Sequence, residues 1–133
     1  MNIFSPKGFL QVGGTVLLVV GLLGMFGILI GPTSEQSIFG SAWWFDAGEN
    51  WAHLVLGLVA LIAAFTFPAN VQKPLVIAVG ILGLVVAVYN IFSTSLLGAN
   101  LESPADLVLH LVVGLWALKA AMGKKGMMET PMA

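Results

Sequence analysis

The chain of 133 residues contains no cysteine and no arginine, and only 8% of its residues are charged. Without cysteine, disulfides, thiolate metal ligands and thiol nucleophiles are excluded. Soluble proteins carry about 25% charged residues, whereas here 59% of the residues are hydrophobic and the mean hydropathy is +1.01. The net charge of −1 offers no basic surface for nucleic acid. We therefore predict an integral membrane protein.

Four long apolar runs divide the sequence. Because a bilayer core of about 30 Å requires about 20 mostly apolar residues, the runs predict transmembrane helices at about 9–30, 48–67, 74–93 and 104–122. Proline follows the first two runs, where it ends a helix readily. The sequence thus predicts an all-α protein with a single four-helix membrane domain over 1–133, including a short flexible tail at 123–133.

The charged residues separate by sign along these runs. Lysines occur before the first run, between the second and third, and at the end of the fourth: Lys7, Lys73, Lys119, Lys124 and Lys125. The two other connections hold Glu35, Asp46, Glu49, Glu102 and Asp106, and only Glu129 in the tail departs from the pattern. Since lysine near a span is retained in the cytoplasm, both termini are predicted to be cytoplasmic and both acidic connections external.

An internal repeat links the second and fourth runs. The segment from Glu49 to Leu61 recurs fifty-seven residues later, with matching acid, His-Leu-Val, Gly-Leu and Ala-Leu positions. The repeat predicts two tandem hairpins of like orientation, with halves at about 1–68 and 69–126. Their pseudo-two-fold axis should then run along the membrane normal.

The paired His-Leu-x-x-Gly helices resemble a known family. The motif stands here as Asn50, His53-Leu54 and Gly57, and again as Asp106, His110-Leu111 and Gly114. In a four-span chain of this length it is similar to a prokaryotic membrane family known only as a domain of unknown function. That family often has asparagine where this chain has Leu107. The resemblance implies a multi-pass protein of the prokaryotic inner (cytoplasmic) or intracytoplasmic membrane, and it implies no activity.

Each repeat places an acid four residues before a histidine, so Glu49 and His53 share one helix face, as do Asp106 and His110. Four interpretations remain open, and one of them is a pH sensor near the external surface that uses the titration of the histidines. The histidines could bond the acid of the other repeat and tie two helices together. His53, His110, Glu49 and Asp106 could hold a divalent metal, as in zinc sites. The two histidines could instead ligate a tetrapyrrole, either haem or a neutral pigment. We expect no cofactor and keep the tetrapyrrole and the metal as alternatives.

The same acids have a structural explanation. Asp46-x-x-Glu49 and Ser103-Pro104-x-Asp106 both look like helix starts, in which an oxygen-bearing N-cap residue is followed by an acid that answers free backbone N–H groups. We accordingly predict helix capping as the main role of Asp46, Glu49, Ser103 and Asp106.

Aromatic residues gather around the first external connection: Trp43, Trp44, Phe45 and Trp51. Rings of this kind are enriched at the membrane interface, so we predict that these four form an interface with headgroups or with a partner. Nothing in the sequence resembles a nucleophile elbow or a phosphate loop, and we expect no enzymatic activity. The predicted function is a small membrane scaffold or accessory subunit. It would contact lipid and either other membrane subunits or further copies of itself. A cofactor- or metal-binding protein that uses His53 and His110 near the external surface is the alternative.

Overall fold

Four helices account for most of the protein, and a computed structural model describes the backbone of residues 1–132 and the side chains of residues 1–122. The helices are α1 (Pro6–Met25), α2 (Ala47–Thr66), α3 (Ala69–Phe92) and α4 (Ala105–Met132). Each has an apolar stretch long enough to cross a membrane. The predicted all-helical, four-span fold is confirmed, and the side of the membrane on which the termini lie stays a prediction.

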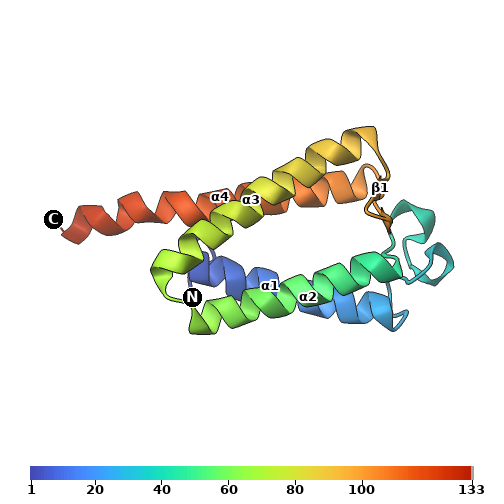
Figure 1. Ribbon diagram of the computed structural model, residues 1–133, viewed down its shortest axis with the longest axis horizontal. Helices are drawn as coiled ribbons and strands as arrows, with labels where there is room; N and C mark the ends of the chain where they lie inside the picture. The colour runs from blue at the N-terminus through green and yellow to red at the C-terminus, as the bar shows by residue number, and fades with distance from the viewer. Residues whose placement is uncertain (133) are drawn as a thin grey trace.

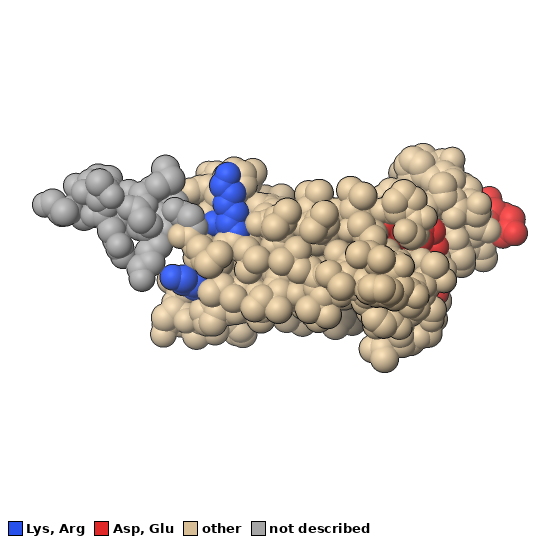
Figure 2. Space-filling view, turned by 90° about the horizontal axis from the view of Figure 1, so that it is seen from above, with Lys and Arg blue, Asp and Glu red and all other residues tan. Residues whose placement is uncertain are grey.

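The helices form two antiparallel hairpins, α1 with α2 and α3 with α4 (Figure 1). One end of the molecule holds the N-terminus and the turn between α2 and α3 (Figure 1). Lysine side chains lie at this end and acidic side chains lie at the opposite end (Figure 2). We call these the lysine end, with Lys7, Lys73 and Lys119, and the acidic end, with Glu49, Glu102 and Asp106. The sequence separation of charge is therefore a spatial separation along the bundle.

Glycine allows the two helices of each hairpin to approach closely. A Cβ on Gly57 of α2 would stand 2.6 Å from the backbone nitrogen of Leu18 and 2.7 Å from the carbonyl oxygen of Gly14 in α1. In the second hairpin, a Cβ on Gly114 would stand 3.0 Å from the carbonyl oxygen of Gly80. Small residues bring membrane helices together because lipid supplies no hydrophobic drive for their association. The glycine seam sets the spacing within each hairpin.

The two hairpins meet at the lysine end through a cluster of mostly small apolar residues. Its buried members come from all four helices: Phe9, Leu10, Ala63, Ala64, Val76, Ala117, Ala120 and Ala121. The ring of Phe9 also packs edge-on against Trp116, with centroids 4.6 Å apart. Trp116 Nε1 donates a hydrogen bond to the Ile3 carbonyl oxygen at 2.8 Å. These contacts fix the N-terminal segment against α4.

The first helix is shorter than predicted because a glycine terminates it. The helix ends at Met25 rather than near Ile30, and Gly27 follows with a φ of 69°. Gly27 N donates to the Gly24 carbonyl oxygen at 3.3 Å, and Ile28 N donates to that of Leu23 at 2.8 Å. This pair of bonds is a Schellman motif, which needs a residue in the left-handed region. The apolar run continues past it, so hydropathy alone places the end too late.

The third helix begins earlier than predicted, and the tail differs as well. It starts at Ala69, directly after the Phe67-Pro68 turn, and includes Pro74. Residues 69–73, which lie between the second and third predicted spans, are therefore helical. At the other terminus, the predicted flexible tail of 123–133 continues α4 to Met132, whereas Ala133 lies outside the described residues.

Both connections at the acidic end are folded. The first contains two short 3₁₀ helices, Ser34–Gln36 and Gly40–Ala42, and Phe45 N donates to the Ile30 carbonyl oxygen at 2.8 Å. The second contains a two-stranded hairpin, β1 (Ser95–Leu96) with β2 (Ala99–Asn100). The all-α prediction missed this hairpin, whose turn places Leu97 and Gly98 at positive φ.

Candidate functional site

Three carboxyl groups from different parts of the chain come together at the acidic end. They belong to Glu49 in the first turn of α2, Glu102 in the connection before α4, and Asp106 in the first turn of α4. One oxygen from each lies within 4.8 Å of the others. The three residues are 5%, 8% and 1% exposed. We call this group the carboxylate cluster. It joins the two hairpins at the end opposite to the lysines.

Local structure positions Glu49. Asp46 is the N-cap residue of α2, and its Oδ1 accepts a hydrogen bond from Glu49 N at 2.8 Å. Its Oδ2 accepts from Asn100 N in β2, also at 2.8 Å. A side chain that caps one helix thus also holds the other connection, and this fixes the start of α2 beside β2.

Two further hydrogen bonds cross between the connections. Trp44 N donates to Glu102 Oε1 at 3.2 Å, and Trp43 Nε1 donates to Asp106 Oδ1 at 3.1 Å. Asp106 Oδ2 accepts from Glu102 N at 2.7 Å. Asp106 therefore satisfies both of its oxygens with donors from two separate segments. These bonds hold the first connection against the beginning of α4.

Glu49 differs from its neighbours, because neither of its carboxyl oxygens has a hydrogen-bond partner among the described residues. Buried polar groups are nearly always bonded, so this free carboxyl group is unusual. The Glu49 side chain accepts no hydrogen bond from a backbone N–H group, in contrast to the capping role predicted for it.

Glu102 lies outside the membrane-spanning segments and is strongly perturbed. Burial raises the pKa of its carboxyl group from 4.5 to about 7. The hydrogen bond from Trp44 N favours the ionised form and limits the rise, whereas the nearby Asp106 carboxyl group adds to it. Near neutral pH, Glu102 therefore populates both its protonated and its ionised form.

The predicted four-residue metal site is not the group that forms. Of its members, Glu49 and Asp106 are in the carboxylate cluster, and Glu102 takes the place of the two histidines. His110 Nδ1 lies 2.7 Å from the carbonyl oxygen of Asp106, one turn earlier in its own helix. His53 packs edge-on against Phe45 at 4.8 Å, and its buried Nδ1 has no partner among the described residues.

This geometry also corrects the predicted tie between the repeats. Neither histidine bonds the acid of the other half in the described part of the chain: His110 bonds locally, and His53 is held by an aromatic contact. Helical spacing placed each acid and histidine on one face correctly. The orientation of each ring depends on its neighbours in space, which the spacing does not report.

The capping prediction for the fourth helix is shifted by one residue. The helix begins at Ala105, so Pro104 directly precedes it and Ser103 lies one position further out. Asp106 reaches back to a backbone N–H, that of Glu102, as a capping acid does. In this helix the acid, rather than Ser103, supplies the bond at the start.

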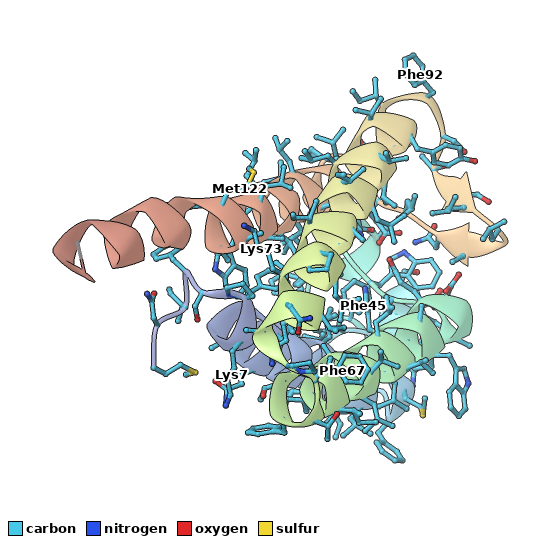
Figure 3. The ribbon with its side chains drawn as sticks, turned by 60° about the vertical axis from the view of Figure 1, so that its left-hand side comes forward. Lys7, Phe45, Phe67, Lys73, Phe92 and Met122 are labelled. Carbon is cyan, nitrogen blue, oxygen red and sulfur yellow. The ribbon has the colours of Figure 1, made fainter. Side chains whose placement is uncertain are left out.

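The four predicted interface aromatics occupy different environments. Phe45 is buried, at 3% exposure, and its side chain points into the protein, whereas Phe92 projects away from it (Figure 3). Trp43 is half-buried between Phe39 and Phe45. Trp44 is half-buried as well, and Trp51 is exposed on α2. Phe45 therefore belongs to the interior, and Trp51 is the most exposed of the four.

Sequence reasoning missed two polar residues that matter. Glu102 was placed in a connection, and no periodic pattern relates it to Glu49. Gln72 is 5% exposed, and its Nε2 donates to the carbonyl oxygens of Ala63, Ala64 and Phe67 at 3.0 to 3.1 Å. Its position four residues after Pro68 is a signal that could have been noticed, since proline leaves a helix carbonyl without a donor.

Comparison with known proteins gives no relative. No family model matches the chain, and no curated protein and no solved structure is similar to it.

Proposed function

We propose that this protein is a small membrane scaffold or accessory subunit, without catalytic activity of its own, in a larger membrane assembly. The observation that carries the proposal is the one-sided packing of α4. From Val108 to Leu115, six of eight side chains are exposed, namely Val108, Leu109, Leu111, Val112, Val113 and Leu115. In this stretch only Gly114 is buried, against α3.

Successive helix residues are separated by about 100° around the axis. The exposed side chains of Leu111, Val112 and Val113 therefore span more than half of the circumference of α4. A helix inside a four-helix bundle usually covers more of its surface by contact with two neighbours. Here α4 has one close neighbour in its middle, and the apolar surface continues into a pocket near the acidic end. That shallow pocket of about 470 Å³ is lined by Phe39, Ala42, Trp43, Pro104, Ala105, Val108 and Leu109. An apolar helix of another subunit fits this surface.

We further propose that the two hairpins are an internal repeat, that both termini are cytoplasmic and that the membrane is the inner membrane of a prokaryote. The charge separation along the bundle supports the orientation, because lysine is retained on the cytoplasmic side. The resemblance to the four-span family of unknown function supports the cellular setting.

A photo-crosslinking residue at Val112 tests the proposed partner surface in the cells that make the protein. We expect a discrete protein adduct and a native-gel complex well above the mass of one chain, 14.0 kDa. An adduct of two chains would identify a second copy as the partner. Val85 is the matched control, since it is 57% exposed on α3 and equally apolar. Lipid adducts alone at both positions, with the protein migrating as a free chain, would contradict the proposal.

A further inference from the structure

The carboxylate cluster contains a buried carboxyl group that forms no hydrogen bond with the described residues. Glu49 is 5% exposed, and both of its oxygens lack hydrogen-bond partners among the described residues. Its carboxyl group lies with those of Glu102 and Asp106, where one oxygen of each is within 4.8 Å of the others. A buried polar group without a partner costs on the order of 1–3 kcal/mol. Helix capping explains Asp46, but it does not explain Glu49.

The other two carboxyl groups are oriented by the protein. Asp106 accepts hydrogen bonds on both oxygens, from Trp43 and from Glu102 N. Glu102 accepts on Oε1, from Trp44 N. Since a carboxylate offers about four acceptor positions, each group keeps lone pairs free. The three side chains thus form a preorganised set of oxygens, in which Glu49 contributes two that nothing else engages.

No lysine compensates the acids at this end in the part of the chain that the structure describes, because the lysine side chains lie at the opposite end (Figure 2). The basic side chains closest in sequence are His53 and His110. His110 Nδ1 faces the carbonyl oxygen of Asp106, and His53 packs against Phe45. Charges buried without compensation are costly. A bound cation would supply that compensation.

We propose that Glu49, Glu102 and Asp106 bind a divalent cation of the Ca²⁺ type at the acidic end of the bundle. This inference is independent of the proposed accessory role, since it concerns a site that joins the two hairpins within one chain. Bound there, the ion connects the first turn of α2 to the start of α4 and to the connection that precedes it.

The donor atoms favour a hard cation. Ca²⁺ takes six to eight oxygen ligands at about 2.3–2.6 Å, so ligands on opposite sides of the ion stand about 5 Å apart, and the 4.8 Å limit fits within that span. Water completes such a shell, as it does in many protein sites. Zinc prefers nitrogen and sulfur ligands, and the histidines do not belong to the cluster. Ca²⁺ alone is therefore the appropriate probe.

The test uses the full chain in detergent or nanodiscs at pH 8, with ionic strength held constant by NaCl. We expect a higher Tm in 5 mM Ca²⁺ than in EDTA, and saturable Ca²⁺ binding by calorimetry. Glu49→Gln should weaken Ca²⁺ binding at least tenfold, in line with the tenfold and larger losses that follow even indirect changes at metal sites. Its Tm in EDTA should stay close to that of the unaltered protein, because glutamine keeps the size and the polarity of the side chain.

Glu35→Gln is the matched control, since it makes the same charge change at an exposed position of the first connection; it should leave the Ca²⁺ shift intact. If Glu49→Gln does not give a monodisperse helical protein, Glu102→Gln serves the same purpose. Equal Tm values in Ca²⁺ and EDTA would overturn the proposal and leave protons as the compensating species. A response to Zn²⁺ alone, lost in His53→Ala, would also overturn it, because the site would then use a histidine.

Discussion

Trp43 donates its indole N–H to Asp106 across 63 residues of sequence, at 3.1 Å, and so joins the first connection to the start of α4. Two further bonds, from Trp44 N to Glu102 and from Asn100 N to Asp46, join the two connections that precede α2 and α4. Contacts at this end are thus mainly polar, whereas the lysine end is held by alanines and aromatic rings. The two hairpins are therefore held together mainly by hydrogen bonds at the acidic end and by apolar packing at the lysine end.

Replacing the indole tests the first of these bonds. Trp43→Phe keeps an aromatic ring next to Phe39 and Phe45 but removes the donor to Asp106. We expect a loss of about 1–2 kcal/mol in the free energy of unfolding, between the average of about 0.6 kcal/mol for membrane hydrogen bonds and the higher values for charged acceptors. Equilibrium unfolding in mixed detergent micelles measures this change.

Trp51→Phe is the control for that substitution, because Trp51 is 58% exposed on α2. It should change stability by less than about 0.5 kcal/mol, as exposed substitutions usually do. Equal effects of the two substitutions would mean that ring size, rather than the bond to Asp106, is responsible.

The glycine seam gives a second prediction, for helix contact within the first hairpin. Gly57→Ala places a Cβ 2.6 Å from the Leu18 backbone nitrogen, and a backbone cannot move aside cheaply. We expect destabilisation by about 1–3 kcal/mol, the usual cost of overpacking, measured by the same unfolding equilibrium.

Gly13→Ala is the matched control in the facing helix. Its Cβ would meet Phe9 and Trp116 at 3.9 Å, an ordinary contact distance. Because alanine is also the better helix former, the change should be neutral or slightly stabilising. A comparable loss in both variants would contradict this explanation, because the close approach at Gly57 would then not be the cause.

Much of the fold follows from local pattern, and the site follows only in part. The apolar runs predicted the four helices, and the distribution of charged residues predicted the two ends of the bundle. The proximity of Glu102 to Glu49 depends on how two irregular connections meet. Such connections have no periodic sequence pattern from which their contacts could be predicted. Helical spacing correctly placed His53 and Glu49 on one face of α2. The contact with Phe45, however, decides where the ring of His53 lies. Site geometry depended on contacts between segments, which one chain's sequence does not display.

Gln72 gives a third prediction, for the turn between the hairpins. Ala64 lies four residues before Pro68, which has no N–H, and Gln72 Nε2 supplies the missing donor at 3.1 Å. Gln72→Met keeps the length of the side chain and removes the donor. We expect a loss of about 1–3 kcal/mol in unfolding free energy, since buried carbonyl groups remain unsatisfied. Gln36→Met, at an exposed position, should cost less than about 0.5 kcal/mol, and a similar loss there would contradict this explanation.

The raised pKa of Glu102 gives a fourth prediction, for the dependence of stability on pH. The folded protein holds the proton up to about pH 7, whereas the ordinary pKa of the group is 4.5. The Glu102 carboxyl group therefore contributes fully to folding stability below pH 4.5, and this contribution is lost as the pH rises towards 7. Above pH 7 the loss is complete. Unfolding measured between pH 4.5 and 8 in EDTA should show stability falling across this window, and Glu102→Gln, which cannot ionise, should fall less steeply. Glu35→Gln should retain the full slope. If Glu102→Gln retained it too, the titration would belong to another group, and the burial of Glu102 would not be the cause.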